Sequence, residues 1–216
     1  MIKVENIDTW GFEHAIRGMR NPLNSWSRSD SYAGEPDCFE NCGNCTLGEF
    51  FVGENDLKLM RQLYVGGQPH RKYLRQIFAV MDITAPLYWW KEFDTYKVGT
   101  TANSCSTMHK IAAKEFTLSD FSTEHLVGKS VAALQNVLDV MNLEREHYLA
   151  AKDKDCWWQM IQLLPSSYNQ RRTVSMTYEN VMNMLDYREG HKLDEWREFC
   201  KILKQLPYVE EIRDGK

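Results

Sequence analysis

Hydrophobic and polar positions in the first half of the chain predict two strands and two helices. Residues 2–7 alternate enough for a first strand, and a short helix is expected over residues 12–19. Asn55 stands where it can cap a second helix, which Gly66 and Gly67 end. Residues 73–84 are rich in β-branched and aromatic side chains, so they are expected to form a central strand. The apolar face of the second helix consists of Leu57, Met60, Leu63 and Tyr64.

The second half of the chain is predicted to be mainly helical. Pro86 is tolerated in the first turn of a helix over residues 87–97, which Gly99 ends. A polar run over residues 100–106 then leads into a helix at residues 107–114. The most regular helical period follows at Val131, Leu134, Leu138 and Met141. Further helices are expected at 157–164, 178–187 and 192–206, with a short extended segment at 172–177.

These elements predict an α+β protein, mainly helical, with a small central antiparallel or mixed sheet. The chain contains no internal repeat and no linker that separates two domains, so one domain over residues 1–216 is expected. Residues 21–50 depart from the pattern, because Ser, Asn, Asp, Gly and Pro dominate there and three cysteines fall among them. We expect an irregular insertion at this place, and loops of that length are usually functional, metal-tied or disordered.

Composition and charge exclude several classes of protein. The 216 residues are 43% hydrophobic, and 26 Lys and Arg stand against 30 Asp and Glu, for a net charge of −4. This balance argues against a general binder of nucleic acid or membrane surfaces, so an anionic ligand would need a local basic site. Because the sequence has no signal-like or membrane-spanning apolar stretch, we expect a cytoplasmic protein with reduced cysteines.

Cys38, Cys42 and Cys45 form a C-x3-C-x2-C pattern inside the irregular segment. Three thiolates on one loop favour an iron–sulfur cluster or zinc, and this spacing is the one that radical SAM enzymes use. Against such an enzyme, Asn44 stands where that family has an aromatic or apolar residue, and the strand–helix alternation of a barrel is missing. A structural metal site and plain reduced cysteines stay open as alternatives, and no metal is assigned.

Small polar side chains precede the helix that is expected at residue 107. Asn and Ser are preferred N-cap residues, so capping explains one of them. The remaining small polar side chains, with His109 and Lys110 beside them, fit the binding of an anionic ligand. Free backbone N–H groups at a helix N-terminus attract anions. The cluster consists of Asn103, Ser104, Cys105 and Ser106.

Arg188 continues the apolar stripe of the helix at residues 178–187, seven positions after Val181. A guanidinium that points inward needs an anion, because an unpaired buried charge is very costly. An Asp or Glu partner would make Arg188 structural, whereas a phosphate would make it part of a binding site. Arg171 and Arg172 either add to the same positive site or lie in a solvated turn.

His70 follows a Gly-Gly-Gln-Pro turn, where a lone His is usually solvated. The tryptophan pairs at residues 89–90 and 157–158 are expected in the core or at a subunit interface, with contact to a flavin or pterin as the alternative. A serine-hydrolase elbow, a P-loop and a dinucleotide fingerprint are all missing from the sequence.

Taken in order, these pieces resemble the flavin-dependent thymidylate synthases (ThyX, the thymidylate synthase complementing family). After a strand and a helix, that family has R-H-R-x-x-S-x-N-x-x-S-x-R, and the S-x-N-x-x-S core is matched by Thr101-x-Asn103-x-x-Ser106. The family also has a Leu-Pro and, later, an Asn five residues before an Arg, matched by 164–165, Asn183 and Arg188. The resemblance runs from about residue 66 to residue 206.

The resemblance implies a ThyX-like fold, bound FAD, and reductive methylation of dUMP to dTMP with methylenetetrahydrofolate and NADPH as co-substrates. A relative that acts on another pyrimidine deoxynucleotide is also open. The resemblance to the family further implies a flavoprotein methyltransferase of nucleotide biosynthesis. The protein would work as a homotetramer, with no nucleic-acid or membrane partner. The nucleotide-binding residues would be Ser104, Cys105, Ser106, Arg188, Arg171, Arg172 and Glu92. The flavin would be lined by His70, Tyr96, Lys97, Thr101, Asn103 and Asn183, and no catalytic residue is assigned.

The chain departs from the family where the flavin and nucleotide are held. Thr95-Tyr96-Lys97 replaces the R-H-R triplet, and Met108 replaces the last Arg of the motif. Lys97 alone cannot supply the bidentate fork of an arginine, so a diphosphate site is weakened. Two alternatives follow: a non-catalytic nucleotide-binding homologue that lost the flavin site, and a metal or iron–sulfur protein built on Cys38, Cys42 and Cys45.

Overall fold

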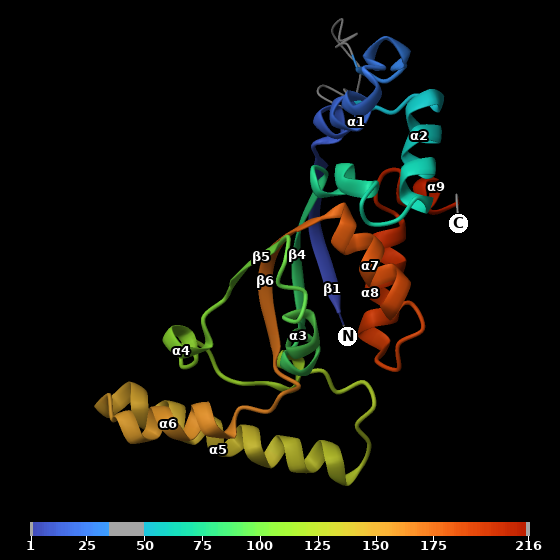
Figure 1. Cartoon of the computed structure of the whole chain (residues 1–216). Coiled ribbons are helices and arrows are strands. Elements are labelled where there is room, and N and C mark those ends of the chain that lie inside the picture. Colours follow the sequence, from blue (N-terminus) through green and yellow to red (C-terminus); the bar gives the residue numbers. More distant parts are fainter. Residues whose placement is uncertain (1, 35–49, 215–216) are drawn as a thin grey trace, which may run out of the picture. The chain divides into compact units, whose positions relative to one another are not determined.

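The structure is a computed structural model that describes residues 2–34 and 50–214 (Figure 1). It is mainly helical with a small sheet, so the predicted α+β class is confirmed. The sheet has the strand order β1-β4-β6-β5, and β2 pairs with β3 as a separate antiparallel ribbon. The strands are β1 (Lys3–Trp10), β2 (Tyr32–Ala33), β3 (Phe50–Phe51), β4 (Phe78–Pro86), β5 (Thr100–Ser104) and β6 (Asn169–Thr177).

Helices supply most of the remaining described residues. Those of the first half are α1 (Phe12–Arg20), α2 (Glu54–Val65), α3 (Leu87–Phe93) and α4 (Thr107–Lys110). Those of the second half are α5 (Lys129–Ala151), α6 (Lys154–Leu163), α7 (Tyr178–Arg188), α8 (Asp194–Lys204) and α9 (Val209–Arg213). Short 3-10 turns are η1 (Asn21–Leu23), η2 (Trp26–Arg28), η3 (Arg71–Arg75) and η4 (Leu118–Asp120). None of the helices in the described ranges is long and apolar enough to cross a membrane.

The chain divides into two compact units, each assembled from three separate segments. Unit 1 comprises Met1–Asn6, Met81–Val174 and His191–Phe199. Unit 2 comprises Ile7–Val80, Ser175–Gly190 and Cys200–Lys216. Each unit has its own packed interior and is described by itself below.

An aromatic cluster forms one part of the interior of unit 1. Trp89 on α3 is fully buried, and its ring lies 4.8 Å from the ring of Trp196 and 5.2 Å from that of Phe93. Trp90 and Phe199 also contact Trp89 edge-on, at centroid distances of 4.9 and 5.4 Å. The prediction that the first tryptophan pair belongs to the core is therefore confirmed.

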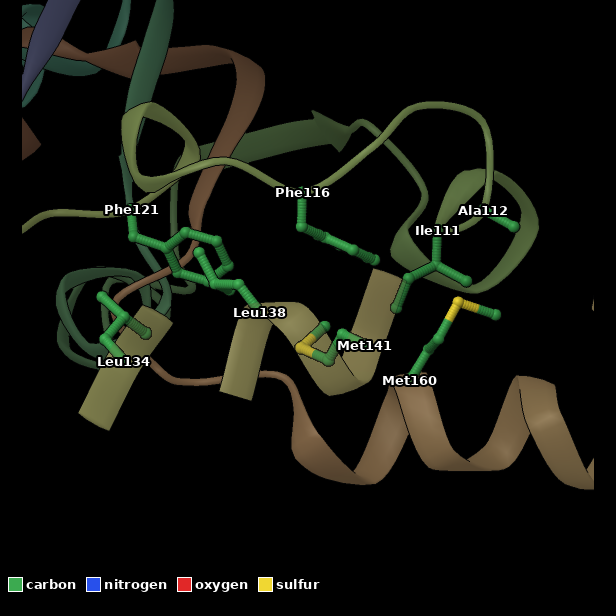
Figure 2. Packing of buried hydrophobic residues seen from close by; sticks show 8 residues of the cluster. All are labelled: Ile111, Ala112, Phe116, Phe121, Leu134, Leu138, Met141 and Met160. Carbon is green, nitrogen blue, oxygen red and sulfur yellow. The ribbon is translucent and has the colours of Figure 1, made fainter. Parts of the chain in front are cut away.

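Helices α5 and α6 pack side by side over a second hydrophobic cluster of unit 1 (Figures 1 and 2). Leu138 and Met141 of α5 and Met160 of α6 are fully buried there, as the predicted period of α5 requires. Phe116 and Phe121 cover the same cluster from the segment that precedes α5. Of the second tryptophan pair, Trp157 packs against this cluster, whereas Trp158 is 41% exposed.

The interior of unit 2 contains a buried ion pair between α1 and α2. Arg20 Nε donates to the Asp56 carboxylate at 2.5 Å, and both side chains are almost completely buried. The N-terminus of α2 is capped from a distant residue, because the Asp30 carboxylate accepts from the backbone N–H of Asn55 and Asp56. A Cβ on Gly53 would lie 2.3 Å from the Asp30 carboxylate, so only glycine allows this close approach.

Several predicted boundaries are wrong. Asn55 lies inside α2 and does not cap it, since Gly53 holds the N-cap position and Asp30 supplies the acceptor. The central strand begins at Phe78 because residues 71–75 form η3, and α3 ends at Phe93 rather than at residue 97. Helix α4 ends at Lys110 rather than at residue 114, and residues 100–104 of the polar run before it form a strand, β5.

Candidate functional site

A network of hydrogen bonds around Asp82 lies on one face of the sheet in unit 1. Its carboxylate accepts from Thr173 Oγ1 at 2.5 Å, from Asn6 Nδ2 at 2.8 Å and from an Arg171 terminal nitrogen at 2.7 Å. These hydrogen bonds, that of Thr173 first, hold the pKa of the Asp82 carboxyl well below its ordinary value. The carboxylate therefore stays charged at neutral pH and pairs with Arg171.

Arg171 and Arg172 project to opposite faces of β6, because successive side chains of a strand alternate. Arg171 is 46% exposed beside Asp82 and Glu5, whose carboxylate lies 3.6 Å away. The Arg172 guanidinium lies 4.2 Å from the centre of the Trp90 ring and pairs with Asp94 at 2.7 Å. The expectation of one positive site that contains both arginines is therefore not met, and neither residue lies in a turn.

The predicted nucleotide-binding run lies beside Arg171. Strand β5 pairs next to β6, the Cys105 backbone N–H donates to the Arg171 carbonyl at 2.9 Å, and Gln170 Nε2 donates to the Cys105 carbonyl at 2.9 Å. Ser106 caps α4, since its hydroxyl accepts from the His109 backbone N–H at 3.1 Å. The side chains of Thr101, Asn103, Ser104 and Cys105 are exposed. This surface, Ser104 to Ser106 with Arg171, is called the β5–β6 surface below.

The anion site that we expected at the start of α4 has weaker support. Helix α4 is a single turn of four residues, so its dipole is small and few backbone N–H groups are free. Any anion at this place would be held by side chains. Arg171 is the cationic side chain of the β5–β6 surface.

Glu92, Tyr96 and Lys97 differ in their surroundings. The Glu92 carboxylate accepts from Trp196 Nε1 at 3.1 Å and lies 3.3 Å from His191 Nε2. The Tyr96 ring packs against the rings of Trp196 and Phe93, whereas Lys97 is exposed. Sequence reasoning missed the contact of Glu92 with His191, because 99 positions of chain separate the two residues and no motif joins them.

Unit 2 contains a cavity of about 1040 Å³ whose charged lining is entirely basic. Apolar side chains, among them Met19, Leu59 and Leu63, also line it, and the described lining includes no Asp or Glu. Such a cavity suits an anionic ligand with an apolar part. The basic side chains that line it are Arg20, Arg28, Lys58, His70, Lys72 and Arg75.

Only some of these cations are neutralised inside unit 2. Arg20 is committed to Asp56, and Arg75 pairs with Glu179 at 2.8 Å. Arg28, Lys58 and Lys72 have no ion-pair partner within the two ranges of residues that the structure describes. Of the basic residues that line the cavity, sequence reasoning singles out only His70, because the others come from four different elements and follow no local pattern.

The remaining predicted residues lie in unit 2 or outside the described ranges. Asn183 and Arg188 are on α7, where both are half-buried, and the stripe of Val181, Met184 and Leu185 is buried as predicted. Neither Asn183 nor Arg188 lines the basic cavity. Cys38, Cys42 and Cys45 fall in residues 35–49, which the structure does not describe.

Comparison with known proteins supports a fold at low sequence identity. No protein-family model matches the chain, and no curated protein matches it either. Two crystal structures of thymidylate synthase X (ThyX) from Helicobacter pylori, both with FAD and dUMP, match it with a TM-score of 0.70 and 15% identity. The first match covers 100% of this chain and 99% of that chain. The fold is ThyX-like.

Within this ThyX-like fold, the degenerate motifs occupy regular elements. Thr101-x-Asn103-x-x-Ser106 runs along β5 and ends at the N-cap of α4, and Asn183 and Arg188 share α7. Thr95-Tyr96-Lys97, which stands where the ThyX family has R-H-R, lies in the segment between α3 and β5. The motif-bearing segments thus belong to both units, with residues 95–106 and 164–165 in unit 1 and Asn183 and Arg188 in unit 2.

Proposed function

We propose that this chain binds a pyrimidine deoxynucleoside monophosphate and acts on it as a flavin-dependent enzyme of the ThyX type. The reaction would be the reductive methylation of dUMP or of a closely related nucleotide, with methylenetetrahydrofolate and NADPH as co-substrates. The observation that carries the proposal is the likeness, over the whole chain, to two ThyX structures that contain FAD and dUMP.

The β5–β6 surface supports the nucleotide part of the proposal. Arg171 offers a forked guanidinium of five N–H donors, and a phosphate can accept from those that face away from Asp82. Asn6 and Thr173 keep the Asp82 carboxylate hydrogen-bonded when Arg171 turns toward a ligand. Ser104 and Ser106 flank Cys105, whose backbone N–H donates to the Arg171 carbonyl, and hydroxyls suit a phosphate or a pyrimidine carbonyl.

The basic cavity of unit 2 supports the flavin part. FAD combines a diphosphate with flat apolar rings, and the cavity is lined by both basic and apolar side chains. Arg28, Lys58 and Lys72 would hold the diphosphate, and His70 would line the cofactor. A bound flavin supplies hydride chemistry, whereas the protein supplies binding, orientation and electrostatics.

A non-catalytic nucleotide-binding protein is the second candidate. At the R-H-R position only Lys97 is a cation, and Tyr96 is occupied with packing against Trp196 and Phe93. A chain that kept the β5–β6 surface but lost the flavin would fit this departure.

The visible absorption spectrum of the protein purified without air separates these candidates. The proposal predicts a flavin spectrum, directly or after addition of FAD, and oxidation of the reduced flavin that depends on dUMP. Nucleotide binding without flavin, even after FAD is added, would select the second candidate. An iron–sulfur band would instead favour the metalloprotein built on the cysteine loop.

Substitution of Arg171 tests the nucleotide site. We expect Arg171→Ala to weaken dUMP binding at least tenfold, about 1.4 kcal/mol, because one charge-assisted contact is lost. Arg197→Ala, which removes an exposed arginine of unit 1 paired with Asp194, should leave the affinity unchanged. Calorimetric titration measures both, and equal affinities for Arg171→Ala and the wild type would remove Arg171 from the site.

A further inference from the structure

Three different metal-ligand side chains meet on the pair formed by α5 and α6 in unit 1. Glu144 and His147 lie one turn apart on α5, and Cys156 lies in the first turn of α6. One ligand atom from each residue lies within 4.8 Å of the other two, and His147 Nδ1 is 4.0 Å from the Glu144 carboxylate. Among the residues that the structure describes, this is the one group of three such side chains.

The backbone under these side chains is held by the hydrophobic cluster of Figure 2. Met141, three residues before Glu144, and Met160, four residues after Cys156, are both fully buried in it. Trp157 and Tyr148, which follow Cys156 and His147 directly, also pack against the cluster. The three ligand side chains therefore project from fixed positions on two helices that cannot separate without exposing this cluster.

The distances of up to 4.8 Å between the ligand atoms of Glu144, His147 and Cys156 are slightly longer than in a metal site, so a bound metal would draw the three side chains together. Tetrahedral zinc with bonds of 2.0–2.3 Å places its ligand atoms roughly 3.3–3.6 Å apart. The side chains of His147 and Glu144 are 57% and 22% exposed, so they can turn inward without disturbing the core. Three protein ligands leave the fourth position of the metal for water.

The local charge also favours a cation. The Cys156 thiol hydrogen-bonds to the Glu144 carboxylate, and the carboxylates of Asp153 and Asp155 also act on it. The nearby ammonium of Lys152 is turned over the Tyr148 ring, 5.2 Å from its centre. A divalent ion at this place would therefore meet the carboxylates of Glu144, Asp153 and Asp155 close to the thiol.

We propose that Glu144, His147 and Cys156 bind a divalent transition-metal ion, with Zn²⁺ as the favoured metal. A thiolate with an imidazole and a carboxylate selects a borderline-soft ion over Mg²⁺ or Ca²⁺, which prefer oxygen ligands. Binding replaces the thiol proton, which passes to solvent, and forms a metal–sulfur bond without oxidation or reduction. The ion would tie α5 to α6, a role separate from the nucleotide chemistry proposed above.

Cobalt substitution tests the site in the full chain. Because Cys38, Cys42 and Cys45 are a second possible set of thiolates, the experiment uses a background in which all three are replaced by Ser. The proposal predicts that this background, stripped of metal, binds one Co²⁺ and shows thiolate-to-cobalt charge-transfer absorption. Cys156→Ser should abolish that absorption, and the persistence of the absorption in this variant would overturn the proposal, as would its absence from the background.

Zinc affinity, measured by competition with a chromophoric chelator, tests the other two ligands. His147→Gln and Glu144→Gln should each weaken Zn²⁺ binding at least tenfold, as expected for loss of a direct ligand. Glu146→Gln, which removes an exposed charge from the same turn of α5, should change the affinity less than twofold, and an equal loss in this control would reduce the site to nonspecific attraction. All these side chains are at least partly exposed, so the variants should keep the wild-type melting temperature without metal. The dUMP affinity should not respond to zinc, so failure here leaves the proposed function untouched.

Discussion

Asp56 is a buried carboxylate whose charge is balanced entirely within unit 2. It accepts hydrogen bonds from Ser29 Oγ at 2.6 Å, from Ser31 Oγ at 2.7 Å and from Arg20 Nε at 2.5 Å. Burial raises the pKa of the Asp56 carboxyl, but these three side-chain hydrogen bonds outweigh it and leave the pKa below its ordinary value. The network ties η2 and the following segment to α1 and α2, beside the basic cavity.

Asp56→Asn should therefore destabilise the protein by about 3 kcal/mol, because it leaves the Arg20 guanidinium buried without a counter-charge. Urea unfolding at neutral pH measures the loss. Glu54→Gln is the matched control, since it removes an exposed carboxylate from the same first turn of α2, and it should cost less than about 0.5 kcal/mol. A similar loss for both variants would show that the ion pair contributes nothing specific.

The same carboxylate should make stability depend on pH. Since its pKa is lowered in the folded state, its contribution is fully present above the ordinary carboxyl pKa and is lost as the pH falls through the folded value. Wild-type stability should thus fall more steeply on acidification than that of Asp56→Asn. Parallel curves from pH 7 down to pH 3, measured by urea unfolding, would contradict this assignment.

Single residues were predicted unevenly from the sequence. The burial of Val181, Met184 and Leu185 was predictable, since a helical period reports burial directly. The cap of α2 was not, because Asp30 reaches it from 25 positions away. The opposite orientations of Arg171 and Arg172 follow from the period of a strand, and they were missed because residues 169–171 were not recognised as strand.

At the scale of elements, the α5–α6 pair depends on a small number of apolar contacts. Leu138 is fully buried between Phe121, Leu134 and Met141 in this cluster (Figure 2), whereas Leu143 on the same helix is 50% exposed. We expect Leu138→Ala to cost about 3 kcal/mol, from lost burial and the cavity left behind. Leu143→Ala should cost less than about 0.5 kcal/mol in the same urea experiment. Equal costs would contradict the packing of α5 described above.

Elements with a strong hydrophobic period were predictable, whereas β5, which depends on pairing with its neighbour, was not. Helix α5 was identified from its apolar spacing, and α1, α2 and α7 were placed within one or two residues. Strand β5 was not predicted, because its Thr, Ala, Asn and Ser residues show no alternation of apolar and polar positions. Its conformation comes from its place beside β6. Helix α9 was missed because it has only five residues, too few for a recognisable period.

At the scale of the whole molecule, the fold could be predicted although no motif is intact. The order of the elements from β4 to α7, with Thr101-x-Asn103-x-x-Ser106 and the pair Asn183 and Arg188 at set places, led to a ThyX-like fold. The basic cavity could not be predicted in this way. Its cations are contributed by η2, α2, α1 and η3, and only the folded chain brings them around one space.

Ligand-induced stabilisation of the whole chain distinguishes the two proposed sites. A ligand at a hundred times its Kd stabilises the folded state by about 2.7 kcal/mol, and each kcal/mol raises the Tm of a chain this size by roughly 2–4 °C. dUMP should raise the Tm of the wild type, and Arg171→Ala should lose that shift while keeping the one given by FAD. Lys72→Glu, which reverses an exposed charge at the basic cavity, should lose the Tm shift given by FAD and keep the shift given by dUMP. If FAD gives no shift in any variant while dUMP does, the chain is a nucleotide-binding protein without flavin. If neither ligand shifts the wild type, both candidate functions are wrong.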